Sequence, residues 1–142
     1  HLNEGEVHMY RYFWKGGALN KTASDFVAVG GILWISVQPD SWVEAASDTW
    51  HSKIDDLAAI VKGFAPAQVM VSVGHEPDIH CDVCGGSRTD EDSGEHSSAD
   101  AAEYPYGSFA DYRAMWDNFQ DRFRVHDVSN VVWVMDYAGK KS

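Results

Sequence analysis

The sequence has no long hydrophobic run and few basic residues. Nowhere in its 142 residues do apolar side chains approach the ~18–20 in succession that a membrane helix needs, so we expect no membrane span. Lys and Arg together number 11 against 22 Asp and Glu, which gives a formal net charge of −11. A chain this acidic repels phosphate backbones, so we expect no general nucleic-acid binding.

Cysteine and proline are also scarce, with two and four residues, whereas aromatic residues are abundant. Six Trp, six Tyr and six Phe accompany an apolar fraction of 44%, which suits one globular domain covering residues 1–142. Aromatic rings combined with acidic groups suit a neutral, polyhydroxylated ligand better than an anionic one.

Three short apolar runs are predicted to be buried β-strands. They cover residues 32–37, 69–73 and 131–135, and they are rich in β-branched residues without polar alternation. Such runs are typical of parallel strands that are covered on both faces. Because helical patterns separate them, the sequence predicts an α/β fold of alternating parallel strands and helices, with its chemistry at the carboxyl ends of the strands.

Two of the helical patterns have apolar residues at intervals of three and four, over 54–64 and 109–123. Ser108 is expected to be the N-cap of the second helix, with Asp111 in its first turn. A further helix is expected before Gly30-Gly31, because glycine commonly follows the last residue of a helix.

Residues 77–107 interrupt this alternation with a long loop that is rich in Asp, Ser, Gly and Glu. Cys81 and Cys84 have the spacing of half a zinc knuckle, with His80 nearby. A disulfide in an extracellular loop explains the pair at least equally well, and two free thiols are a third option. We therefore predict no resident cofactor, with zinc or calcium in this loop as alternatives. A glycosylation sequon at 20–22 mildly supports secretion.

Residues that can carry chemistry follow the expected strands. The second strand continues into His75 and Glu76, where a shielded glutamate can hold a proton near neutral pH and act as a general acid. Alone, the pair is weak evidence for catalysis, and a helix-cap carboxylate or a surface pair would be the better interpretation. Asp136 follows the third strand and is expected on the same rim.

The aromatic residues fall into two groups. Trp34 and Trp133 lie inside strands, so we expect them in the core. Four aromatic residues are expected to line the rim and stack on sugar rings: Trp42, Tyr104, Tyr106 and Tyr137.

Five segments occur in a recognisable order, namely Gly30-Gly31-Ile32, HEPD at 75–78, YPYG at 104–107, the aromatic helix at 109–123 and NVVWVMDY at 130–137. Their order and spacing over residues 26–139 resemble glycoside hydrolase family 26, which contains mainly β-mannanases. The resemblance implies a (β/α)8 TIM barrel and a retaining mechanism that uses two carboxylates.

The resemblance also implies roles for single residues. Glu76 matches the family's acid/base at the end of the fourth barrel strand, and His75 matches the histidine that orients the substrate and catalytic groups. Tyr104 and Tyr106 match the aromatic loop near the cleaved bond, and Trp133 matches the tryptophan of the fifth strand.

Two substitutions and the length of the chain depart from the family pattern. Asp78 stands where the family usually has the asparagine that binds substrate, and Asp117 stands where it commonly has an arginine. A complete barrel needs ~250 residues, which is more than this sequence has. The resemblance implies that the three predicted strands are strands three to five. The family nucleophile, a glutamate after strand seven, would then lie beyond Ser142, and Asp136 is the only other carboxylate expected on the visible rim.

The sequence therefore predicts a secreted hydrolase of mannan-type β-glycans that is incomplete in this chain. Its partners would be a polysaccharide substrate and either a second copy or the missing half of the barrel, because an incomplete barrel exposes strand edges. A non-catalytic carbohydrate-binding protein and a zinc-stabilised interaction protein are the alternatives.

Overall fold

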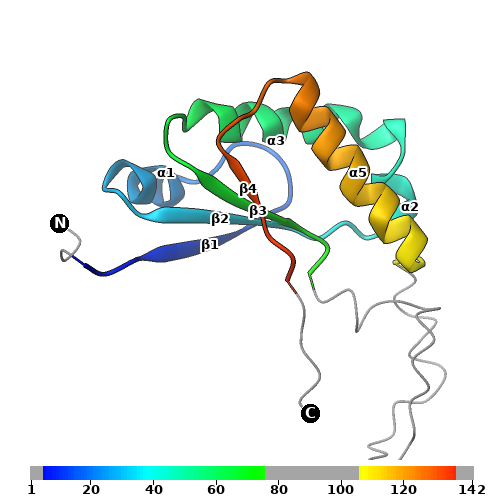
Figure 1. Ribbon diagram of the computed structural model, residues 1–142, viewed down its shortest axis with the longest axis horizontal. Coiled ribbons are helices and arrows are strands. Elements are labelled where there is room, and N and C mark those ends of the chain that lie inside the picture. The colour runs from blue at the N-terminus through cyan, green and yellow to red at the C-terminus, as the bar shows by residue number, and fades with distance from the viewer. Residues whose placement is uncertain (1–4, 76–105, 137–142) are drawn as a thin grey trace, which may run out of the picture.

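The computed structural model describes residues 5–75 and 106–136, and Figure 1 shows their arrangement. Within these two ranges, no helix is long and apolar enough to cross a membrane. The elements follow one another as β1 (Met9–Trp14), α1 (Lys21–Ala28), β2 (Ile32–Val37), α2 (Trp42–Ala45), the 3-10 turn η1 (Asp48–Trp50), α3 (His51–Gly63), β3 (Val69–Val73), α5 (Phe109–Val125) and β4 (Val131–Trp133).

The four strands form one parallel sheet in the order β1-β2-β3-β4. The order never reverses, and Figure 1 shows the helices on one face of the sheet. Crossovers between parallel strands are right-handed, so strands that advance steadily in one direction place their helices on the same face. The predicted α/β fold with a parallel sheet is confirmed, and its sheet is wound in one direction only.

The sequence predicts three strands, but the sheet has a fourth, β1, at one edge. In β1, Tyr10, Tyr12 and Trp14 face the helices, while Arg11 and Phe13 alternate with them on the opposite face. Because β1 has a charged residue in its middle, it gives no continuous run of β-branched residues, and the sequence pattern did not predict this strand. The last strand, β4, is shorter than the predicted 131–135, although the Val134 amide still donates to the Val71 carbonyl at 2.9 Å.

The hydrophobic core lies between the sheet and its helices. The helix-facing residues of β2 and β3 are fully or almost fully buried, as are the apolar stripes of α3 and α5. The opposite face of the sheet differs, because no helix of the described residues covers it. Phe13 is 57% exposed there, and Trp34 and Met70 are only partly buried.

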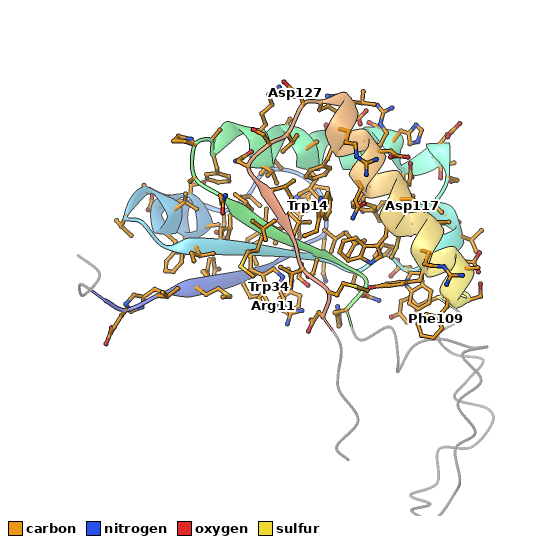
Figure 2. All side chains as sticks on the ribbon, in the orientation of Figure 1. Arg11, Trp14, Trp34, Phe109, Asp117 and Asp127 are labelled. Atoms are coloured by element: carbon orange, nitrogen blue, oxygen red, sulfur yellow. The ribbon has the colours of Figure 1, made fainter. Side chains whose placement is uncertain are left out.

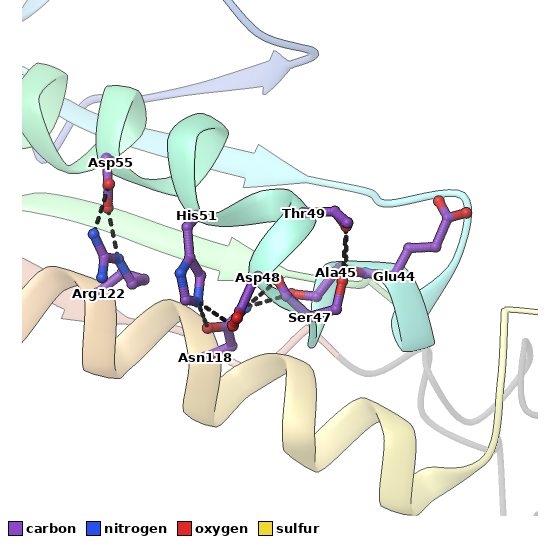
Figure 3. A network of polar contacts seen from close by, with 9 residues as sticks. All are labelled: Glu44, Ala45, Ser47, Asp48, Thr49, His51, Asp55, Asn118 and Arg122. Carbon is purple, nitrogen blue, oxygen red and sulfur yellow. Dashed lines mark hydrogen bonds and ion pairs between the residues drawn. The ribbon is translucent and has the colours of Figure 1, made fainter.

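Helices α2, α3 and α5 are tied together by polar contacts (Figure 3). The Arg122 guanidinium donates two hydrogen bonds to the Asp55 carboxylate, at 2.8 and 2.7 Å, and His126 lies 2.9 Å from the same carboxylate. The hydrogen bond from Arg122 is the main reason that the pKa of Asp55 lies below its ordinary value. The Asn118 amide donates to the carbonyls of Ala45 and Ser47 at 2.9 and 3.2 Å. These contacts fix the helices that carry the loops at the carboxyl edge.

Helix α5 begins where the sequence predicts. Ser108 is its N-cap, and Ser108 and Asp111 form a reciprocal capping box. Hydrogen bonds from the Ser108 side chain and backbone lower the pKa of Asp111. This cap fixes the position at which α5 begins.

Candidate functional site

The carboxyl ends of β2, β3 and β4 lie side by side, which brings Gln38, His75 and Asp136 to one edge of the sheet. The His75 amide donates to the Gln38 side-chain oxygen at 2.9 Å. One residue earlier, the Gly74 amide donates to the Val37 carbonyl at 2.8 Å. The segment that leads into Glu76 is therefore anchored to the neighbouring strand.

Gly74 turns the chain out of β3 with a left-handed backbone, at φ +65°. A Cβ atom at this position would lie 2.9 Å from Tyr112 Cε2 and 3.0 Å from Met115 Cε. The Tyr112 hydroxyl also donates to the Gly74 carbonyl at 3.3 Å. Glycine is therefore required by both the backbone conformation and the close approach of α5. The turn places the His75 ring 6.3 Å from the Phe13 ring, in an edge-to-face contact.

A polar cluster occupies the face of the sheet that the helices leave open. Its members are Arg11, Trp34, Ser36, Ser72 and Asp136, and Figure 2 shows Arg11 and Trp34 on the side away from the helices. Arg11 donates to the Ser36 hydroxyl at 3.0 Å and forms an ion pair with Asp136. Ser72 donates to Ser36 at 3.2 Å and accepts from the Trp34 indole at 2.9 Å. The guanidinium lies 4.2 Å from the centre of the Trp34 ring, at cation–π distance.

The ion pair between Arg11 and Asp136 joins the first and last strands of the described sheet. Asp136 lies three residues beyond the end of β4, so the chain after β4 brings its carboxylate across the open face to β1. The polar cluster therefore spans the open face of the sheet.

Trp42 was expected to line the rim, and this prediction is wrong. Its side chain is fully buried, and its ring packs edge-to-face against Tyr112 at 5.1 Å. The Tyr106 ring stacks on Trp42 at 5.9 Å, and the Trp42 amide donates to the Tyr106 carbonyl at 2.7 Å. The pair thus joins the start of α2 to the segment before α5. Tyr106 is half-buried, so it keeps some exposed surface at this edge.

Trp133 lies on the helix side of the sheet, with its ring centre 4.8 Å from that of Phe123 and 5.6 Å from that of Trp116. This position agrees with the core placement expected for a strand residue and gives no support to direct substrate contact. Trp34, also assigned to the core, instead lies with Arg11 on the face of the sheet that the helices leave open. Asp117 is exposed on α5.

The remaining candidate residues lie outside the described ranges. This applies to the expected acid, to two rim aromatics, to the residue in the asparagine position and to the metal candidates of the loop, namely Glu76, Tyr104, Tyr137, Asp78, His80, Cys81 and Cys84. Within 5–75 and 106–136, no three His, Cys, Asp or Glu side chains come together as a metal site.

Sequence reasoning missed Arg11, Ser36 and Ser72. The sequence does contain a pattern that indicates the two serines, because the runs over 32–37 and 69–73 both end in Ser-Val. In the structure, Ser36 and Ser72 are register partners. A small polar residue at the same height of two buried strands indicates a polar layer on one face. Arg11 could be added only once β1 was placed beside β2.

No family model matches this chain, and no curated protein matches it.

Proposed function

We propose that this chain is part of a (β/α)8 barrel that hydrolyses a mannan-type β-glycan. The sheet supports a barrel in two ways: its strands are sequential, and its helices lie on one face. If β3 is the fourth barrel strand, as the family resemblance implies, β1 is the second. The chain then supplies strands two to five, one more than the sequence predicts.

The observation that carries the proposal is the anchored turn after β3. The acid/base of the family follows the fourth strand, and Glu76 follows His75 directly in this chain. Hydrogen bonds at Gly74 and His75 hold the residues before Glu76 against β2 and α5 at the carboxyl edge. Barrel enzymes carry their chemistry at that edge.

In the proposed reaction, Glu76 protonates the glycosidic oxygen while a second carboxylate attacks the anomeric carbon. The sugar–oxygen bond breaks, a covalent glycosyl-enzyme forms, and Glu76 then takes a proton from the water that hydrolyses it. Asp136 does not match the family nucleophile in position, and its carboxylate is paired with Arg11. By the family resemblance, the nucleophile is a glutamate after the seventh barrel strand. A polymeric substrate of this kind also requires secretion.

The substitution Glu76→Gln tests the acid in the full-length reading frame. The amide keeps the shape but has no proton to transfer, so mannan hydrolysis should fall by ~10²–10⁴-fold. An aryl mannoside, whose leaving group needs little protonation, should lose far less in the glycosylation step. Glu44→Gln makes the same chemical change on the exposed surface of α2 and should leave both rates unchanged. Equal mannan hydrolysis by Glu76→Gln and its parent would exclude Glu76 as the acid.

A carbohydrate-binding protein without hydrolysis is the second candidate. The ion pair of Asp136 favours it, because this carboxylate is the second one expected on the rim and it is already engaged. Binding of mannan, xylan or mixed-linkage glucan without cleavage by the full-length protein would establish this alternative.

A further inference from the structure

A pocket of about 250 Å³ lies at the carboxyl ends of β1 and β2, beside the start of α3. It is smaller than the ~300–1,000 Å³ pockets that hold drug-sized ligands, so it suits a single sugar ring. Trp14 and Trp50 supply aromatic walls, and its polar lining comes from Lys15, Gln38, Asp40 and Lys53. The hydrogen bond between Gln38 and His75 connects this pocket to the turn after β3.

The Lys53 ammonium is held in place by the two indoles. It lies 4.4 Å from the centre of the Trp50 ring and 5.8 Å from that of Trp14. The Trp14 indole N–H donates to the Gly17 carbonyl at 2.8 Å, which fixes the orientation of that ring. Among the described residues, no carboxylate forms an ion pair with Lys53 or Lys15. The chain as a whole has a net charge of −11, whereas this pocket has two lysines without an ion-pair partner and one carboxylate.

Gln38 adds a third donor. Its side-chain oxygen accepts from the His75 amide, so its amide nitrogen points away from that bond. This nitrogen is buried and has no hydrogen-bond partner within the described part of the chain. A buried donor without a partner costs free energy, and a ligand acceptor would remove that cost. The pocket thus offers three donor side chains and one carboxylate, the exposed Asp40.

We propose that this pocket binds a hexuronate, a sugar ring that carries a carboxylate. The carboxylate would accept from Lys53 and from the Gln38 amide, and the C–H groups of the ring would pack against Trp50. This inference rests on the proposed function and deepens it: the substrate is a β-glycan with acidic residues or branches, which this pocket recognises beside the cleaved chain. A neutral hexose lacks the charged acceptor that the lysines favour.

The test is a titration of the full-length protein with sodium D-glucuronate at low salt, in which binding is followed by tryptophan fluorescence. Lys53→Met keeps the length of the side chain but removes its charge, and it should weaken binding by about tenfold or more, as the loss of a charged hydrogen bond does. Lys21→Met removes the same charge from the exposed surface of α1 and should bind like the parent. Near-UV circular dichroism of each variant confirms that the fold is retained.

Comparing D-glucuronate with D-glucose and with acetate tests recognition of the carboxylate and of the sugar ring separately. D-glucuronate should bind more tightly than D-glucose and more tightly than acetate. Equal binding of glucose would refute recognition of the carboxylate, equal binding of acetate would refute the sugar ring, and no binding of glucuronate would refute the site. Glu76→Gln should bind glucuronate like the parent. Binding of glucuronate can therefore be tested even if the protein does not hydrolyse mannan, and hydrolysis can be tested even if glucuronate does not bind.

Discussion

Replacing Gly74 by alanine should destabilise the fold by about 2–5 kcal/mol. The left-handed backbone at φ +65° costs a residue with a Cβ atom about 1–2 kcal/mol. The new methyl group would also lie 2.9 Å from Tyr112 Cε2. Tyr112 is 3% exposed and packed between Trp42 and Trp116, so its ring has little room to move, and overpacking of this kind costs about 1–3 kcal/mol.

Alanine substitutions at two other glycines, Gly30 and Gly63, separate the backbone cost from the cost of overpacking. Gly30 has a φ of +90°, and no atom lies within 4 Å of the place that an alanine methyl group would take, so Gly30→Ala should lose only the backbone cost of about 1–2 kcal/mol. Gly63 ends α3 without a left-handed backbone and also has free space, so Gly63→Ala should gain about 0.5–1 kcal/mol. Urea unfolding measures the three changes in free energy. In thermal unfolding, Gly74→Ala should melt roughly 5–20 °C below its parent. A loss at Gly74 no larger than that at Gly30 would refute the close packing of α5 on this turn.

Two further predictions concern the supports of the site. Ser108→Ala removes the cap of α5 and should lower the free energy of unfolding by about 1 kcal/mol, whereas Ser108→Asp, which can also cap, should lose less; urea midpoints compare the two. Asp55→Asn should cost about 1 kcal/mol at pH 7 through its lost pairing with Arg122. Because the pKa of Asp55 is lowered by folding, its carboxylate stabilises the protein above the pKa of the unfolded state, and this stabilisation is lost as the pH falls. The urea midpoints of parent and Asp55→Asn should therefore converge below about pH 4, and a constant gap from pH 7 to pH 3 would contradict the argument.

Local patterns predicted the elements that bury continuous apolar runs. The strands over 32–37 and 69–73 are found with the same bounds, and Ser108 caps α5 with Asp111 in its first turn. These features depend on short stretches of chain, because burial on both faces and capping leave direct marks in the sequence.

Features set by neighbouring elements were harder to predict. Whether Trp42 lines a rim or closes the core depends on Tyr112 and Tyr106, which approach from another part of the chain. Likewise, Arg11 meets Asp136 across 125 positions of sequence, and no local pattern encodes a contact at that separation. The position of His75 at the strand end was predictable, whereas the pocket beside β1 required the strand that the pattern missed.

The ion pair between Arg11 and Asp136 also bears on the order of folding. The two residues are 125 positions apart, the longest separation of any side-chain hydrogen bond in the described ranges, while each strand pairs with its neighbour along the chain. Contacts between neighbours in sequence close short loops and form early, whereas this contact needs the sheet assembled first. Its loss should therefore leave the folding rate almost unchanged and appear as faster unfolding, so the pair would add to the kinetic stability of the folded sheet.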